Sequence, residues 1–357
     1  MKLAIFFPGI GYHCDKPLLY YAEKLCRQSQ YETLRLTYTS PSRSIPEAFE
    51  PVYTQTEAQL AQINWNAYDD ILFVSKSLGT AVAAAYAKRH HISCRNIYYT
   101  PLAETFDFAP QSGIVFHGTS DPWAQTAVIE EKCQESCLPL HIIEHTNHSL
   151  ELPQNAVLEN LRILEHVMTF SEMYISHNLY FRPLCEKELC RDLFCSFIRR
   201  QQVVKCWRRE NDQWVIKDAP FIDDWSEEDY QFLVKCLQNT LRTGGFVYGA
   251  FCGGAQKDML KGFTSVESAF LGSAKQYLDL SCIHVSQELR GKGIGAVLFQ
   301  EAKNWAKKKG GKKLYISAHS AVETQAFYQR MGCVDALEYD QHHVEAEPFD
   351  RQLECIL

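Results

Sequence analysis

Residues 290–295 read Arg-Gly-Lys-Gly-Ile-Gly, and they join two stretches with different apolar patterns. Residues 277–285 have the composition of a β-strand, and the residues after the loop, as far as Gly310-Gly311, repeat apolar side chains at helical spacing. Glycines let a backbone approach a ligand, and the N–H groups at a helix start have no partner within the helix. Together with the helix dipole they attract an anion, so this stretch predicts a diphosphate-binding loop.

Two other phosphate-binding loops do not fit these residues. A Walker loop ends in Gly-Lys followed by Ser or Thr, whereas Gly295 is followed by Ala296-Val297. A dinucleotide-binding loop needs the spacing Gly-x-Gly-x-x-Gly and an acidic residue at the end of the next strand. The strand predicted over residues 313–317 ends without one. The pattern that remains is Arg-x-x-Gly-x-Gly.

A second motif follows that strand. Residues 326–333 read Ala-Phe-Tyr-Gln-Arg-Met-Gly-Cys. Together with the Arg-x-x-Gly-x-Gly loop, they resemble the signature of the GNAT acetyltransferase superfamily, with Cys333 where the family has an aromatic residue. The order of strand, glycine loop, helix, strand and Phe-Tyr helix is similar to the family throughout. The resemblance covers residues 178–357 and implies an α+β fold with a mixed sheet.

The resemblance implies an acetyl-CoA-dependent N-acetyltransferase that acts on a primary amine. Tyr328 matches the family's tyrosine, which protonates the departing CoA thiolate. The pantetheine arm would enter between two strands that splay apart near Ile283 and Val285. One departure from the family is Ala321, which stands seven residues before Tyr328, where Asn is frequent. The residues that would bind the diphosphate are Arg290, Gly291, Lys292, Gly293, Ile294 and Gly295.

The general base and the acceptor stay open at this point. Glu267 and Asp279 lie on predicted strands that face the cleft, and either could take the amine proton through water or be a structural carboxylate. The acidic run at residues 223–229 has two interpretations, attraction of a cationic amine or a solvated helix start with a capping box. Peptide N-termini, polyamines, aminoglycosides and amino-acid analogues all remain as acceptors.

The N-terminal half has a different organisation. Short apolar runs alternate with helical stretches, which predicts an α/β fold with a mainly parallel sheet. A helix predicted from Pro153 onward closes this half, and residues 175–178 form the predicted linker. We therefore expect two domains, residues 1–174 and 178–357, the second of which contains a predicted hairpin over residues 246–266. The runs that predict parallel strands are residues 3–7, 31–37, 71–74, 114–117 and 138–143.

Residues 71–79 read Ile-Leu-Phe-Val-Ser-Lys-Ser-Leu-Gly and predict a buried strand that enters a tight turn before a helix of small residues. This is the context of a nucleophile elbow, in which a serine lies on a sharp strand-to-helix turn. Ser77 is the candidate nucleophile, with Ser75 in place of the first glycine of Gly-x-Ser-x-Gly. The Leu78 N–H could stabilise an oxyanion. Lys76 has two interpretations, a ligand of a substrate carboxylate or a solvated lysine.

An acid and a base follow Ser77 in the chain order of the α/β-hydrolase fold. Asp121 and His148 each lie in the loop that follows a predicted strand. The alternatives to His148 are His13, His117 and His145, of which His145 is the nearest. In this scheme Asp121 orients His148, which takes the Ser77 proton.

Residues 7–11, Phe-Pro-Gly-Ile-Gly, resemble the family's oxyanion loop, which would place the second N–H donor at Ile10 or Gly11. The N-terminal half thus resembles a small, lidless α/β-hydrolase of the dienelactone-hydrolase type. That resemblance implies a serine hydrolase with a Ser77-Asp121-His148 triad.

Composition excludes several other classes. The net charge of −7 argues against a nucleic-acid partner. The 14 cysteines include no Cys-x-x-Cys pair, so we expect no metal. No apolar run is long enough for a signal peptide or a membrane span, and we expect a cytoplasmic protein. Many members of the acetyltransferase family dimerise, so a homodimer is an option.

Three functional hypotheses follow. The first is a bifunctional enzyme with an acetyltransferase and a serine hydrolase. The second is a single-activity acetyltransferase whose hydrolase-like half is a non-catalytic binding module. The third makes both halves acyl-binding sensors without turnover.

Overall fold

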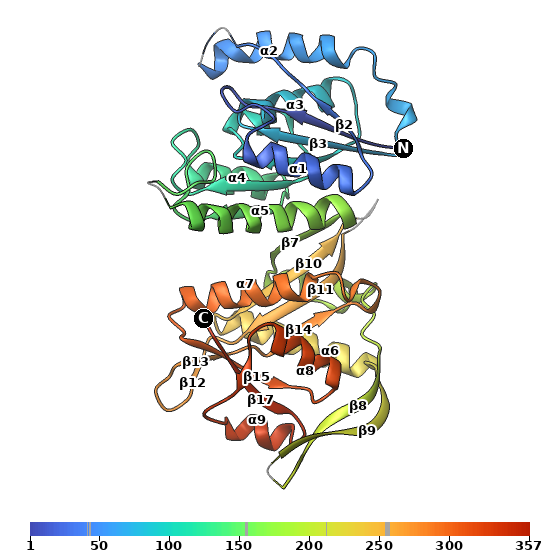
Figure 1. Cartoon of the computed structure of the whole chain (residues 1–357), viewed down its shortest axis with the longest axis vertical. Coiled ribbons are helices and arrows are strands. Elements are labelled where there is room, and N and C mark those ends of the chain that lie inside the picture. Colours follow the sequence, from blue (N-terminus) through green and yellow to red (C-terminus); the bar gives the residue numbers. More distant parts are fainter. Residues whose placement is uncertain (41, 43, 154–155, 212, 254–257) are drawn as a thin grey trace. The chain divides into compact units, whose positions relative to one another are not determined.

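The structure is a computed structural model that describes residues 1–40, 42, 44–153, 156–211, 213–253 and 258–357. The chain divides into two compact units, Met1–Tyr180 and Phe181–Leu357, each with its own sheets and helices (Figure 1). We describe the two units separately.

The first unit is built on a six-stranded sheet in the order β2-β1-β3-β4-β5-β6. All neighbouring strands run parallel, which confirms the mainly parallel sheet predicted from the sequence. Sequence analysis did not predict β4, which starts with the polar pair Arg95-Asn96. The strands are β1 (Lys2–Phe7), β2 (Glu32–Arg35), β3 (Asp70–Lys76), β4 (Arg95–Tyr99), β5 (Ile114–Gly118) and β6 (Leu140–Ile143).

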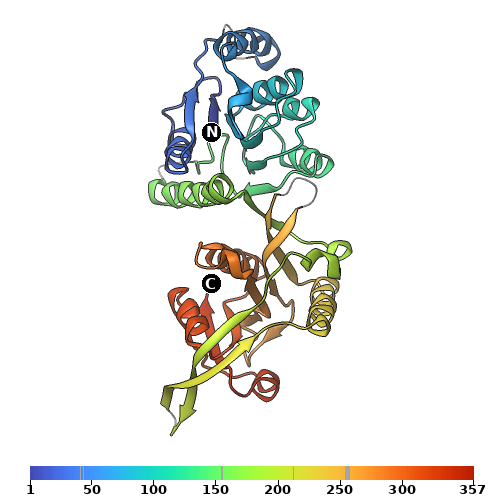
Figure 2. The ribbon, with the colours of Figure 1, turned by 90° about the vertical axis from the view of Figure 1, so that its right-hand side faces the viewer.

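Helices cover both faces of this sheet (Figure 2). The central strand β3 is therefore buried along nearly its whole length, and its apolar run does not alternate with polar residues. On one face the Tyr99 hydroxyl hydrogen-bonds to Ser171 of α5 at 2.7 Å. The helices are α1 (Pro17–Gln28), α2 (Ile45–Leu60), α3 (Leu78–Arg89), α4 (Thr126–Glu135) and α5 (Val157–His177), with 3₁₀ turns η1 (Trp65–Ala67) and η2 (Ala103–Phe108).

The segment predicted as a linker, residues 175–178, is helical as far as His177. Ile175 is buried, and the hydroxyl of Ser176 lies 2.9 Å from that of Ser29. These contacts continue α5 through residues whose polarity had suggested a linker. The helix ends at Asn178, which takes the left-handed conformation common at helix C-caps (φ 51°).

The second unit combines a four-stranded sheet, β14-β11-β10-β7, with a five-stranded sheet, β12-β13-β15-β17-β16. The pairs β10–β11, β11–β14, β12–β13, β15–β17 and β16–β17 are antiparallel and the pair β13–β15 is parallel, as the predicted mixed α+β architecture requires. The strands are β7 (Leu179–Pro183), β10 (Phe246–Cys252), β11 (Met259–Val266), β12 (Phe270–Leu271), β13 (Tyr277–Asp279), β14 (Cys282–Val285), β15 (Lys313–Ala318), β16 (Val334–Asp335) and β17 (Arg351–Ile356).

The hairpin predicted over residues 246–266 is present as the antiparallel pair β10–β11. Sequence analysis did not predict a second hairpin, β8–β9, which forms a two-stranded sheet of its own. Its strands are β8 (Gln201–Glu210) and β9 (Gln213–Asp223). The helices of this unit are α6 (Glu227–Arg242), α7 (Ile294–Lys308), α8 (Val322–Arg330) and α9 (Gln341–Ala346), with 3₁₀ turns η3 (Glu186–Glu188), η4 (Arg191–Phe194) and η5 (Gln287–Leu289).

Candidate active sites

The predicted diphosphate loop lies at the start of α7. Gly291 and Gly293 have left-handed backbones, with φ angles of 78° and 82°, and Gly293 is the N-cap of the helix. No side chain caps this helix start within the part of the chain that the structure describes. The first N–H groups of α7 are therefore free to bind an anion, and the helix dipole adds positive potential there.

Arg290 has a structural role in this loop. Its guanidinium donates hydrogen bonds to three backbone carbonyls, those of Val285 at 3.0 Å, Arg200 at 3.1 Å and Arg199 at 2.8 Å. These bonds hold the loop in position, and the diphosphate contact of Arg290 stays a prediction. Lys292 is exposed, and the side chain of Ile294 is buried in the core behind the loop.

The stretch predicted as one strand over residues 277–285 changes its partner halfway. The Leu280 N–H bonds to the Tyr315 carbonyl of β15 at 2.9 Å, whereas the Ser281 N–H bonds to the Ser265 carbonyl of β11 at 3.1 Å. As a result β13 pairs with β15, and β14 pairs with β11 at the edge of the other sheet. The strands diverge from Leu280 onward, slightly before the half-buried Ile283 and Val285.

Tyr328 lies on α8 and is almost entirely buried against Phe299 and Phe327. Burial raises the pKa of its hydroxyl well above the usual range, so Tyr328 keeps its proton at neutral pH. The preceding Phe327 packs on the diphosphate loop, because a methyl group at Gly295 would lie 3.1 Å from its ring. The two sequence motifs therefore meet in space.

Ala321, which replaces the family's frequent Asn, contacts the β8–β9 hairpin. It forms an isolated bridge with Cys206 of β8, and the neighbouring Ser320 carbonyl accepts a hydrogen bond from the Trp207 N–H at 2.8 Å. The unpredicted hairpin thus covers the start of α8.

The two candidate bases have different surroundings. Glu267 accepts hydrogen bonds from the hydroxyls of Thr240, at 2.5 Å, and Ser281, at 3.1 Å. Asp279 is buried, and its Oδ2 lies 3.1 Å from Nε2 of His343 on α9. The other oxygen, Oδ1, is buried without a hydrogen-bond partner among the described residues. Sequence analysis missed His343, which follows Asp279 by 64 positions.

Several carboxylates of the acidic run at residues 223–229 form ion pairs or hydrogen bonds within the second unit. Asp223 pairs with Arg199, and Glu227 pairs with Arg191 at 2.8 Å. Ser226 and Asp229 form the capping box that starts α6. These pairings leave the helix-start interpretation as the one that fits.

The elbow at Ser77 lies between β3 and α3. Ser77 has φ 54° and ψ −126°, a conformation that residues with a Cβ rarely adopt. Its N–H bonds to the Tyr99 carbonyl at 3.2 Å, and its carbonyl accepts a hydrogen bond from the Thr80 N–H at 2.9 Å. Leu78 is the first residue of α3, so its N–H has no partner within the helix.

Two glycines bring the end of β1 against this elbow. A Cβ at Gly9 would lie 2.9 Å from the Ser77 Cβ, and a Cβ at Gly79 would collide with the backbone carbonyls of Phe7 and Pro8. Ile10 lies at the tip of a turn that reciprocal hydrogen bonds between Gly9 and Tyr12 close. The predicted oxyanion donors, at Ile10 and Leu78, are therefore on neighbouring segments.

His148 lies closer to Asp121 than the buried His117, whose Nδ1 is 4.0 Å from the Asp121 Oδ2. The Nδ1 of His148 lies 2.7 Å from the Asp121 Oδ2, while His145 is exposed. The other carboxylate oxygen of Asp121 accepts the Trp123 N–H at 2.9 Å. The Thr100 hydroxyl donates to the His148 carbonyl at 3.0 Å. The preceding residue, Tyr99, accepts the Ser77 N–H through its carbonyl, so neighbouring residues contact both Ser77 and His148. The His148 Nε2 is buried without a hydrogen-bond partner among the described residues.

Burial lowers the pKa of His148, whereas the hydrogen bond to Asp121 raises it. The charge on Lys76 also lowers this pKa, and the net effect is a decrease. The interpretation of Lys76 as a solvated lysine is wrong. Its side chain is fully buried, because the ring of Tyr12 covers it with the Nζ 5.0 Å from the ring centroid.

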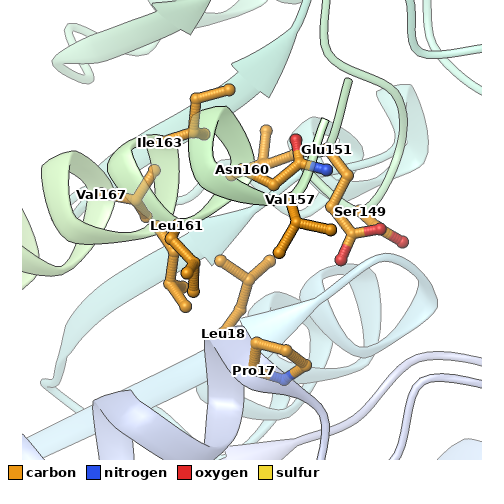
Figure 3. Close-up of a pocket in the computed structure, with 11 residues that line it drawn as sticks. Pro17, Leu18, Ser149, Glu151, Val157, Asn160, Leu161, Ile163 and Val167 are labelled. Carbon is orange, nitrogen blue, oxygen red and sulfur yellow. The ribbon is translucent and has the colours of Figure 1, made fainter. Parts of the chain in front are cut away.

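A cavity of about 260 Å³ lies beside the His148 loop, between α1 and α5 (Figure 3). Ser149, Leu150 and Glu151, which follow His148, form one wall, and the remaining walls are mainly apolar. The rest of the lining comes from Pro17, Leu18, Val157, Asn160, Leu161, Ile163, Leu164 and Val167.

Within the described residues, no group of three or more His, Cys, Asp or Glu side chains is arranged to hold a metal ion. No helix in the described part of the chain has both the length and the apolar character to cross a membrane.

Residues 201–333 match the model of the acetyltransferase (GNAT) family. No curated protein matches the chain. Among solved structures, a nourseothricin acetyltransferase is 16% identical with a TM-score of 0.35, covering 49% of this chain and 95% of its own. The PaiA N-acetyltransferase of Thermoplasma acidophilum, in complex with coenzyme A, is 16% identical with a TM-score of 0.32, covering 50% and 99%. An α/β serine hydrolase homologue of Coxiella burnetii is 14% identical with a TM-score of 0.37, covering 47% and 83%.

The close approach of α3 to β1 gives a stability prediction. Gly79→Ala forces a methyl group against backbone carbonyls that cannot move independently, and should destabilise the first unit by about 3 kcal/mol in denaturant unfolding. Gly11→Ala is the control, because nothing lies within 4 Å of its Cβ position. Its left-handed backbone limits the cost to about 1 kcal/mol. Equal effects of the two substitutions would contradict the packing at Gly79.

Proposed function

Because the second unit carries an acetyltransferase (GNAT) domain, we propose that the protein transfers an acetyl group from acetyl-CoA to a primary amine, through residues 178–357. The observation that carries the proposal is the uncapped start of α7 behind two left-handed glycines, beside strands that diverge at Leu280. The structural similarity to an N-acetyltransferase in complex with coenzyme A is consistent with this cosubstrate.

The backbone N–H groups of Gly291, Gly293, Ile294 and Gly295 bind the diphosphate in this proposal, and the pantetheine arm follows the edge of β14 past Ile283 and Val285. The backbone dipoles of the loop hold the dianion, and the exposed Lys292 between the two glycines adds a cation beside it. Arg290 keeps the loop in place through its three carbonyl contacts.

The reaction forms a bond between the amine nitrogen and the acetyl carbon and breaks the bond between that carbon and sulfur. The thiolate that leaves takes the proton of the Tyr328 hydroxyl, which burial keeps protonated. We assign the proton of the amine to Asp279 in place of Glu267. Asp279 is buried beside His343, and one of its carboxylate oxygens has no hydrogen-bond partner among the described residues, whereas the Oε1 of Glu267 already accepts from two hydroxyls.

Binding of coenzyme A tests the loop directly. Gly293→Asp places a carboxylate and a Cβ at a left-handed N-cap, and should weaken coenzyme A binding by about a hundredfold in calorimetry because the charge repels the diphosphate. Gly310→Asp is the matched control, since Gly310 has a similar φ of 88° at the opposite end of α7. If both variants bind like the wild type, the proposed cofactor site is wrong.

Acetyl transfer to a panel of amines tests the chemistry, and it is measured as the release of the CoA thiol from acetyl-CoA. Tyr328→Phe should lower kcat by about a hundredfold and leave coenzyme A affinity unchanged, because only the proton donor is lost. Asp279→Asn should also lower kcat, and Glu267→Gln should not. The reverse result would move the base to Glu267, and the absence of thiol release with every amine would favour an acyl-binding sensor.

A second candidate function is favoured by the contact between Asp121 and His148. We propose that the domain predicted over residues 1–174, which lies within the first unit, is a serine hydrolase acting on an ester, thioester or amide. Ser77 attacks the carbonyl, His148 takes the Ser77 proton, and Asp121 stabilises the resulting imidazolium. The bond to the leaving oxygen, sulfur or nitrogen then breaks, the leaving atom takes the proton from His148, and water hydrolyses the acyl group from Ser77. The N–H groups of Leu78 and Ile10 bind the oxyanion. The alternative is a binding module without turnover.

A fluorophosphonate probe separates these two possibilities. We expect it to label the wild-type protein and to leave Ser77→Ala unlabelled, because the probe reacts only with an activated serine. Ser149→Ala is the matched control, since Ser149 follows His148 and should not change labelling. A wild-type protein that resists the probe would identify the first unit as a binding module.

We also propose a cytoplasmic location. Cys26, Cys133 and Cys206 are free thiols, the form that persists in a reducing compartment.

A further inference from the structure

Lys76 is the one lysine, among the residues that the structure describes, whose side chain is fully buried. It precedes Ser77 directly, and its Nζ has no hydrogen-bond partner among those residues. An ammonium group removed from water is costly unless it is paired, so such a residue requires an explanation. The packing of the sheet does not supply one, because an apolar side chain of similar length would fill the same space.

The groups around Lys76 come from three loops and belong to the hydrolase-like site. Tyr12, on the loop after β1, lies with its ring over the Nζ, and its own hydroxyl accepts the Leu18 N–H at 3.1 Å. Asp121, after β5, acts on Lys76 as the nearby negative charge. His148, after β6, lies with its Nδ1 2.7 Å from the same Asp121, and the charge on Lys76 lowers its pKa. The charge of Glu151 raises the pKa of the Tyr12 hydroxyl. The buried His117 of β5 belongs to the same cluster, because its Nδ1 lies 4.0 Å from the Asp121 Oδ2.

We propose that the buried Lys76 ammonium acts on the His148 imidazole and so determines the pH range in which Ser77 can be activated. The inference rests on the proposed hydrolase function of the first unit. Lys76 is a positioning residue in this scheme, because it acts through His148 and not on a substrate.

The sign of the effect follows from the charges. A neighbouring ammonium disfavours the imidazolium form and helps to keep the pKa of His148 low, so His148 remains a free base in mildly acidic solution. Burial lowers the pKa of Lys76 itself to about 7, partly opposed by Asp121. The influence of Lys76 is therefore present below that pH and disappears as the pH rises through it.

The rate at which a fluorophosphonate labels Ser77, measured across pH, tests this proposal. Lys76→Met keeps the length and removes the charge, so the acidic limb should move to higher pH. Labelling at its acidic end should be roughly tenfold slower than in the wild type. Above the range in which Lys76 is charged, the two rates should coincide. Lys16→Met is the control. It removes an exposed charge from the loop that carries Tyr12, and it should leave the pH profile of the labelling rate unchanged.

Two results would overturn the proposal. One is an unchanged acidic limb in Lys76→Met. The other is a labelling rate that falls equally at every pH, which would indicate a structural role of Lys76. Lys76→Gln is a second neutral variant if the methionine protein does not fold. Titration of the His148 imidazole by NMR gives a readout that needs no activity. If the wild type resists the probe, the hydrolase function fails. The NMR titration then decides the coupling by itself. A higher pKa of His148 in Lys76→Met would support the coupling, and an unchanged pKa would refute it.

Discussion

The hydrogen bonds of two consecutive residues, Leu280 and Ser281, point to different strands. Leu280 bonds to β15 and Ser281 to β11, so a single stretch of chain belongs to both large sheets of the second unit. Past this point β14 is an edge strand, and an edge strand in a protein normally invites another chain to pair with it. In the proposed site the ligand occupies that edge. In the proposed site, the opening between the two diverging strands is surrounded by the start of α7, the Phe327 ring and Asp279.

The first unit relies on a different constraint, the close approach of backbones at its glycines. Gly79 allows α3 to begin against the Phe7 carbonyl, and Gly9 allows the next loop to reach Ser77. Because side chains are absent at both contacts, N–H groups from two segments can face one point in front of the serine. The loops after β5 and β6 add Asp121 and His148 at the same edge of the parallel sheet.

The sequence predicted those parts of the molecule in which residue type and local spacing determine the structure. The parallel sheet, the β10–β11 hairpin and the start of α7 follow from apolar runs and glycines that are adjacent in the chain. The strand over residues 277–285 was predicted without its change of partner, because a continuous apolar run does not indicate which strands lie beside it. The β8–β9 hairpin escaped prediction since its strands are half exposed and rich in charged residues. His343 and the burial of Lys76 depend on distant segments, α9 and the Tyr12 loop, that no local pattern reports.

The backbone of Ser77 has a consequence for how the first unit would change over time. With φ at 54°, glycine would fit this position with less strain than serine, by about 1–3 kcal/mol. Random drift toward a more stable fold would therefore tend to erase the hydroxyl. Its presence in this chain means that the elbow holds a side chain that works against the stability of its own turn.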